Sequence, residues 1–264
     1  MSTYDMLPQK FLYSQQSLDT FDKCPVMFRY RYIERLGWNS AASLEQKKAL
    51  ERGKSFHLLA KRYFLGIEPD PYMFENADNS LVIWFQNLKQ TFAPDDKNMY
   101  LPEYSIVLRS GKIRLQAIAD LIVVNSEGIE IWDWKTHNSE LQPEPGAARR
   151  KLEKSLQTKV YIYLAGEFAA RSNDPMLSMH VKSGVPIRMH YWQPEPPGII
   201  ASISCDSRDR EEYGKLIESK IDRIDNYDWQ SFDKRLYSNN CRYCEFNRLC
   251  NKSAWGFNDP VGVL

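Results

Sequence analysis

The stretch Ile129-Glu-Ile-Trp-Asp133-Trp-Lys135-Thr136 is the strongest indication of the fold that we expect for this chain. Its β-branched and aromatic residues follow a turn signal, so a strand is predicted from Gly128 to Thr136. Because strand side chains alternate between the two faces of a sheet, Asp133 and Lys135 project from the same face. A carboxylate and an ammonium on a half-buried face are costly unless they pair or bind something. Two interpretations stay open, a buried ion pair and a cation site.

Turn signals before this strand predict two further strands. Residues Asn125-Ser126-Glu127-Gly128 separate it from an apolar run at Lys112–Val124, and Ser110-Gly111 separates that run from Glu103–Leu108. Asp120 interrupts the otherwise apolar second part of the middle run, residues 117–124. We therefore expect an antiparallel arrangement with carboxylates on neighbouring strands.

Two carboxylates on neighbouring strands can hold a hard cation. Mg²⁺ takes oxygen ligands from one or two carboxylates and keeps several waters. A bound cation lowers the pKa of such a water, and the adjacent Lys135 can orient the water and offset charge that develops on a phosphorus atom. These are the parts that a phosphodiesterase needs. In the alternative interpretation, Asp133 and Lys135 form a structural pair and Asp120 caps a loop.

Hydrophobic periodicity predicts helices on both sides of the strands. A short helix follows Ser14, a second begins at Pro25, and a helical insertion is expected over about 66–102. Longer helices are predicted over 44–65, 79–92, 147–170 and 206–226, with extended segments over 177–193 and 198–205. The fold class is therefore mixed α/β, built on a largely antiparallel or mixed sheet flanked by helices.

Composition sets wide limits on function. With 264 residues, 43% of them hydrophobic and 26% charged, we expect one soluble domain over 1–264. No run of eighteen apolar residues and no signal-peptide pattern occurs, so we expect a cytoplasmic protein without a membrane partner. No GxxxxGK[ST] phosphate loop is present, which disfavours an NTPase.

The net charge of +1 means that contact with a nucleic acid needs a local basic patch. Two candidate patches occur, although such runs are often only solvated helix faces. They are Arg29, Arg31 and Arg35, and the group Arg149, Arg150, Lys151, Lys154 and Lys159.

Four short motifs, taken in order, resemble the RecB-like branch of the PD-(D/E)xK nucleases. They are Gly53-Lys-Ser-Phe-His57, Asp120, Asp133-Trp134-Lys135-Thr136 and Gln157-Thr-Lys-Val-Tyr161. The second acidic residue is Asp133 where many relatives have Glu. The resemblance implies a restriction-endonuclease-like core and a metal-dependent DNA exonuclease. It would act on single-stranded DNA or DNA ends, in repair, recombination or CRISPR-type defence.

The same resemblance implies a role for each motif residue. His57, Asp120, Asp133 and the carbonyl of Trp134 would ligate Mg²⁺ or Mn²⁺, since an imidazole ligand also suits Mn²⁺. Lys135 would be catalytic together with the two aspartates. Gln157 and Tyr161, four residues apart on one helix face, would support Lys135 or touch the nucleic acid. Glu103 resembles an acidic residue that the branch often has at the preceding strand, but we favour a structural role for it.

Three of the five cysteines lie close together near the end of the sequence. Cys241-x2-Cys244-x5-Cys250 has the spacing of metal ligands, and a reducing compartment favours metal binding over disulfides. A zinc site would need a fourth ligand, for which Cys24 and Cys205 are the candidates. Cys205 ends a predicted strand and is expected to be a small core residue.

Cys24 with the later three cysteines resembles the iron–sulfur subset of RecB-like nucleases, which includes the AddB nuclease domain and CRISPR-associated RecB-like exonucleases. The resemblance implies a [4Fe-4S] cluster held by Cys24, Cys241, Cys244 and Cys250, with the later ligands in a segment of about 236–256. Such a clasp would tie the two ends of the chain together, a structural role. Zinc and a set of free thiols stay open as alternatives.

Function also has open alternatives. The chain could be a RecB-like DNA-binding or assembly subunit of a larger complex, with weak or no cleavage of its own. A helicase or a CRISPR adaptation protein would then be its partner, because no helicase motif occurs in this sequence. A zinc-stabilised structural protein is a third class.

Overall fold

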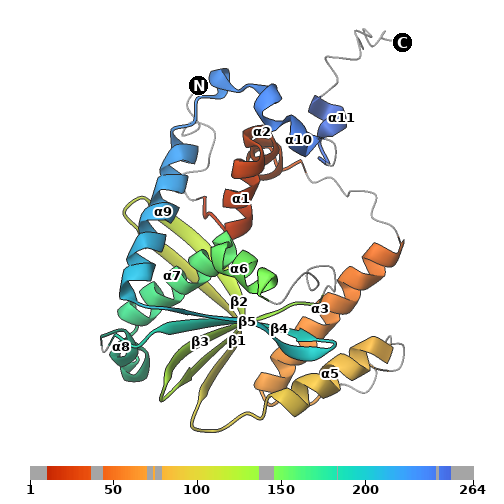
Figure 1. Ribbon diagram of the computed structural model, residues 1–264, viewed down its shortest axis with the longest axis vertical. Helices are drawn as coiled ribbons and strands as arrows, with labels where there is room; N and C mark the ends of the chain where they lie inside the picture. Colours follow the sequence, from red (N-terminus) through yellow and green to blue (C-terminus); the bar gives the residue numbers. More distant parts are fainter. Residues whose placement is uncertain are drawn as a thin grey trace, which may run out of the picture.

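The computed structural model describes residues 11–36, 44–69, 74, 79–136, 146–182, 184–241 and 244–250. Within them a five-stranded sheet has the order β1-β2-β3-β4-β5 (Figure 1). The strands are β1 (Met99–Ser110), β2 (Ile113–Asn125), β3 (Gly128–Trp134), β4 (Ile187–Pro194) and β5 (Pro197–Cys205). Neighbours are antiparallel except β3 and β4, which are parallel. The predicted mixed sheet is confirmed.

The two predicted turns are present. Gly111 has a φ of 57°, which glycine adopts without the steric cost of a side chain. The side chain of Asn125 accepts hydrogen bonds from the backbone N–H groups of Glu127 and Gly128, at 2.8 and 3.0 Å. One boundary was wrong, because β1 already begins at Met99. Residues 99–102, assigned to the insertion, belong to the sheet.

One face of the sheet packs against α1 (Gln15–Lys23), α2 (Pro25–Phe28), α7 (Leu156–Arg171) and α9 (Ser207–Asp225). In Figure 1, α7 and α9 lie on the side of the sheet opposite α3. Tyr13 joins this core to β2 through backbone hydrogen bonds of 2.8 Å with Arg114 and Gln116. Its buried hydroxyl donates to Asp225 at 2.7 Å. The segment before α1 is thereby fixed to the sheet.

The other face packs against α3 (Leu44–Phe64) and α5 (Asn79–Thr91), close to the predicted helices. This second core is rich in aromatic side chains. Its buried aromatic members are Phe56, Phe64, Trp84, Phe85, Trp134 and Trp192. Because Phe56 precedes His57 on α3, the packing of this core sets the position of the histidine relative to the strands.

The helix predicted over 147–170 is interrupted. It forms α6 (Ala147–Lys154) and then α7, because Ser155 has an extended backbone with ψ of 147°. The Ser155 hydroxyl accepts a hydrogen bond from the N–H of Thr158, which caps the new helix. Gln157 consequently lies in the first turn of α7.

The extended segment predicted over 177–193 was wrong in its first part. Residues Pro175–Lys182 form the helix α8, and only from Ile187 does the chain enter β4. Asp174 accepts a hydrogen bond from the N–H of Leu177, and Pro175 occupies the first helical position, which suits proline. A short apolar run does not distinguish helix from strand by periodicity.

Short elements complete the described chain. The π-helix η2 (Arg29–Ile33) follows α2, and the 3₁₀ helices η4 (Trp229–Ser231) and η5 (Lys234–Tyr237) lead to α10 (Ser238–Cys241) and α11 (Asn247–Cys250). Figure 1 places α2 beside α10 and α11, so segments from opposite ends of the sequence meet. Across the described ranges, no helix has the length and apolar character needed to cross a membrane.

Candidate metal centre

Three of the four predicted motifs, those of His57, Asp120 and Asp133–Lys135, meet in one open cavity of about 900 Å³, whereas Gln157 and Tyr161 do not line it. Its walls come from α3, from β1 to β3 and from the two residues after β3. The lining residues are Leu50, Gly53, Lys54, His57, Leu58, Lys61, Glu103, Asp120, Asp133, Trp134, Lys135 and Thr136. Residues up to 86 positions apart in the sequence, from Leu50 to Thr136, therefore share this cavity.

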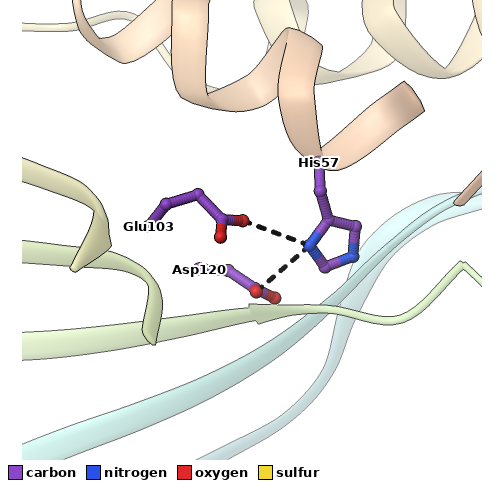
Figure 2. A group of neighbouring side chains, drawn as sticks. All are labelled: His57, Glu103 and Asp120. Carbon is purple, nitrogen blue, oxygen red and sulfur yellow. Dashed lines mark ion pairs between the residues drawn. The ribbon is translucent and has the colours of Figure 1, made fainter. Parts of the chain in front are cut away.

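His57, Glu103 and Asp120 form a compact group (Figure 2). The Nδ1 atom of His57 lies 3.1 Å from Oδ1 of Asp120 and 3.5 Å from Oε1 of Glu103. One ligand atom from each residue lies within 4.8 Å of the others. An imidazole and two carboxylates at this spacing are a suitable ligand set for Mg²⁺ or Mn²⁺.

The pKa values in this group indicate an excess of negative charge. Burial raises the pKa of Asp120 to about 6, and the nearby charge of Asp133 adds to the increase, although the hydrogen bond from His57 opposes it. Burial alone would lower the pKa of His57, but the hydrogen bonds and charges of Asp120 and Glu103 raise it to about 10. The protonated imidazole of His57 thus partly balances the two carboxylates. A divalent cation bound in place of that proton would bring a larger positive charge.

Glu103 has an unusual backbone that is tied to this group. Its φ of 49° lies in the left-handed region, which costs a residue with a Cβ about 1–2 kcal/mol. The β1–β2 ladder pairs Pro102 with Leu121 and Tyr104 with Ala119, leaving Glu103 opposite Asp120 without a ladder pair. The two carboxylates therefore face one histidine from adjacent strands.

We favoured a structural role for Glu103, but its carboxylate lies beside His57 in the group that could hold a metal ion. A signal for this position was present in the sequence, in the two-residue turn formed by Gly111 and Lys112. Ser110 pairs with Ile113 on either side of this turn, and residues equally far from that pair lie opposite each other, so residue 103 lies opposite residue 120. Hairpin register thus predicts the pairing of these two acidic residues.

Asp133, Lys135 and Gln157 form a second group in which each side chain contacts the other two. Lys135 Nζ lies 2.9 Å from Asp133 Oδ2 and donates to Gln157 Oε1 at 3.1 Å. Gln157 Nε2 donates to Asp133 Oδ1 at 2.5 Å. The predicted placement of Asp133 and Lys135 on one face agrees with this contact. Asp133 lies outside the compact histidine group, and its role as a metal ligand stays a prediction.

Asp120 and Tyr161 fix the strands around the cavity. The second oxygen of Asp120 accepts a hydrogen bond of 2.7 Å from the backbone N–H of Trp134. Tyr161 donates from its hydroxyl to the carbonyl of Ile118 at 2.9 Å, and burial raises its pKa. Gln157 thus reaches Lys135, whereas Tyr161 anchors α7 to β2. The carbonyl of Trp134 as a metal ligand stays a prediction.

Gly53 allows α3 to come close to the end of β3. A Cβ atom at this position would lie 2.9 Å from the hydroxyl oxygen of Thr136, closer than real Cβ contacts. The glycine stands one helical turn before His57. A larger residue here would push the helix that carries the histidine away from the strand that carries Asp133.

The four predicted cysteine ligands line a separate cavity of about 200 Å³, which we call the cysteine pocket. It contains Cys24, Cys241, Cys244 and Cys250. Cys205 lies elsewhere, buried in the core beside the hydroxyl of Tyr213 at 3.4 Å. Burial raises the pKa of both Cys244 and Cys250, and the neighbouring cysteines add to the increase.

Polar contacts between the two ends of the chain surround the cysteine pocket. Arg31 Nε donates to Glu245 Oε1 at 2.9 Å, and Asn240 donates to the carbonyl of Lys23 at 2.6 Å. The ring of Tyr30 also packs on that of Phe246, with centroids 5.4 Å apart. The ends are therefore held beside each other by contacts next to the cysteines.

The sulfur spacing in the cysteine pocket bears on what could fill it. Of the residues that the structure describes, no three cysteine sulfurs lie within 4.8 Å of one another. Four thiolates around one zinc ion, at about 2.3 Å each, would lie about 4 Å apart. At least some of these sulfurs would therefore have to move closer together to surround one zinc ion.

The mixed sheet, with helices on both faces and an acidic centre on its strands, defines an α/β protein with a restriction-endonuclease-like core. The family profile of the PD-(D/E)XK nuclease superfamily matches residues 13–251. The chain belongs to this superfamily. Membership indicates metal-dependent nuclease activity.

Other comparisons add little. A solved structure described as the crystal structure of SSO0001 is 13% identical, with a TM-score of 0.41. That match covers 93% of this chain and 88% of the other. No curated protein matches the chain significantly.

Proposed function

We propose that this protein is a metal-dependent DNA exonuclease that acts on single-stranded DNA or DNA ends. Repair, recombination or CRISPR-type defence would be its setting. The observation that carries the proposal is the meeting of two groups in one cavity. One group is the ligand set of His57, Glu103 and Asp120, and the other is the Asp133–Lys135 pair.

The metal of this proposal is Mg²⁺ or Mn²⁺. His57, Glu103 and Asp120 would hold it, with Asp133 and the carbonyl of Trp134 as further ligands. The donor set fits the ion, because an imidazole and two carboxylates offer nitrogen and oxygen ligands, and burial with the nearby charge of Asp133 raises the pKa of Asp120. When bound, the cation supplies Lewis acidity and a water of lowered pKa.

The side chains beside the ligand set would position the reacting groups. Lys135 carries a positive charge on the cavity wall, where it would offset negative charge that develops on the scissile phosphate. Gln157 holds the ammonium of Lys135 at 3.1 Å and the carboxylate of Asp133 at 2.5 Å. The glutamine thereby restricts both side chains to one geometry.

For the cysteine pocket we propose a [4Fe-4S] cluster with a structural role. Its support is the gathering of Cys24, Cys241, Cys244 and Cys250 around one cavity, because thiolates are the usual ligands of such clusters. Zinc is the alternative occupant. A broad absorption band near ~400 nm after anaerobic purification would identify the thiolate-bound cluster.

A DNA-binding or assembly subunit remains the second candidate function. It is favoured by the closed Asp133–Lys135–Gln157 group, in which every member already has a partner. This function predicts stable DNA binding without metal-dependent turnover. A helicase or a CRISPR adaptation protein would be the expected partner.

An assay with end-labelled single-stranded DNA and Mn²⁺ tests the proposed exonuclease. Progressive loss of label by the parent protein, abolished by EDTA, is the expected result, and comparison of the two labelled ends gives the polarity. Binding without any metal-dependent cleavage would contradict the proposal and favour the assembly subunit.

A further inference from the structure

One face of α3 combines basic and apolar side chains beside the metal centre. Leu50, Lys54, Leu58 and Lys61 all line the large cavity, on the same side of the helix as His57. Their spacing of three and four residues makes them successive neighbours along one helix face. This α3 face therefore forms one wall of the cavity that contains the acidic centre.

The two lysines of the α3 face are placed to meet anions. Lys54 has a side chain that is 62% exposed and pairs with Glu51 at 2.8 Å, a surface contact that water screens and that leaves the ammonium able to bind a phosphate. Lys61 lies seven residues further along, which corresponds to about 10 Å at the helical rise. Two ammonium groups at this separation can reach different phosphates of one strand.

The two leucines of the α3 face are exposed, although buried apolar side chains stand next to them on the same helix. Leu50 is 50% exposed and Leu58 is 49% exposed, whereas Phe56 and Leu59 on the same helix are fully buried. Unpaired bases offer their flat apolar surfaces to a protein, while a duplex keeps these surfaces stacked inside. Alternating leucine and lysine thus suits a single strand better than a duplex.

We propose that the α3 face is the track for a single nucleic acid strand. Lys54 and Lys61 bind its phosphates, Leu50 and Leu58 contact its unpaired bases, and the strand runs past His57 to the acidic centre. This inference rests on the proposed nuclease function, for which it names the single-strand specificity residues.

The test measures binding separately from cleavage. The full-length protein in EDTA is titrated into a fluorescent oligo-dT strand and into a fluorescent hairpin duplex, at several salt concentrations. Lys54→Ala/Lys61→Ala is expected to weaken single-strand binding about tenfold. The slope of the logarithm of the binding constant against the logarithm of the salt concentration is also expected to become less steep by about 1.4. Each phosphate contact on a single strand contributes about 0.7 to that slope, and the variant removes two. Lys54→Arg/Lys61→Arg should restore both quantities.

A matched control and a second variant sharpen the test. Lys48→Ala removes an exposed lysine from the opposite side of α3 and should change neither affinity nor slope. Leu50→Ala/Leu58→Ala should weaken binding of the single strand and leave duplex binding and the salt slope unchanged. Thermal unfolding of each variant verifies the fold, since alanine favours a helix.

Two results would overturn the proposal that the α3 face binds a single strand. One is a double lysine variant that binds oligo-dT with the affinity and salt slope of Lys48→Ala. The other is a double leucine variant that loses duplex and single-strand binding equally. Failure of the proposed nuclease function has a different signature, in which the parent and all variants lack Mn²⁺-dependent cleavage while the binding differences persist.

Discussion

The acidic centre and the cysteine pocket differ in what holds their residues in place. His57, Asp120 and Asp133 stand on a long helix and two central strands, between two large hydrophobic cores. The cysteines stand on or beside helices of four residues, α2, α10 and α11. Helices this short are not stable by themselves. The first site is therefore maintained by the fold, whereas we propose that a bound group adds to the few contacts that hold the second site together.

The two sites also differ in ligand chemistry. Carboxylate and imidazole groups suit Mg²⁺ and Mn²⁺, while thiolates suit zinc and iron–sulfur clusters. A change in one site should accordingly leave the metal content of the other unaltered. Variants in one site therefore test whether the two sites are independent.

Lys135→Ala should have the largest effect. We expect Mn²⁺-dependent cleavage of end-labelled single-stranded DNA to fall about 10³-fold, because the charge that faces the phosphate is lost. Absorbance from the cysteine pocket should stay at the parent value. A variant that cleaves as fast as the parent would contradict the assignment of Lys135, and a loss of absorbance would contradict the separation of the sites.

Cys24→Ser should act on the other site. Loss of one ligand is expected to remove the absorbance near ~400 nm. It should also lower the free energy of unfolding by about 2–5 kcal/mol, by analogy with loss of a long covalent cross-link. Chemical denaturation and iron analysis measure these effects.

Cys205→Ala is the matched control for Cys24→Ser, because Cys205 is buried in the core away from the cysteine pocket. It should keep the parent iron content. Equal iron loss in both variants, or none in Cys24→Ser, would refute the ligand assignment.

Glu103→Gly and Glu103→Ala separate the carboxylate from its backbone strain. Both should weaken Mn²⁺ binding about tenfold in calorimetric titrations, since both remove a ligand. Glycine tolerates the φ of 49°. The free energy of unfolding of Glu103→Gly should therefore be about 1 kcal/mol higher than that of Glu103→Ala. Equal stabilities would show that the left-handed conformation is not retained in solution.

Gly53→Ala should give the smallest effect. Its Cβ would crowd the hydroxyl of Thr136 at 2.9 Å, so we expect Mn²⁺ affinity to fall a few-fold as α3 shifts. Adding Thr136→Ala removes that hydroxyl and should restore most of the affinity, relative to Thr136→Ala alone. A double variant that is no better than Gly53→Ala would contradict this steric explanation.

The elements that the sequence predicted best are those with a strong period or a turn signal. Asp133 and Lys135 lie on one face as strand alternation requires, and α3 covers nearly the whole segment predicted from 44 to 65. The break at Ser155 was not predicted, because the pattern of apolar residues continues through it. The break depends on the hydrogen bond by which the Ser155 side chain caps α7. Periodicity alone cannot detect such a change in direction.

The site was harder to predict than the fold. The ion pair at Asp133 followed from two residues on one strand, but the part played by Glu103 depends on the register between two strands. The gathering of Cys24 with Cys250 depends on contacts between segments more than two hundred residues apart, such as that of Arg31 with Glu245. Contacts between distant segments like these come from tertiary packing, which a single sequence does not specify residue by residue.

Anomalous diffraction from crystals grown with Mn²⁺ would locate the metal of the proposed centre without relying on activity. We predict a Mn²⁺ peak at coordination distance from His57, Glu103 and Asp120, on the side of the cavity that Asp133 and Lys135 also line. A well-occupied peak elsewhere, with none between these three residues, would contradict the account.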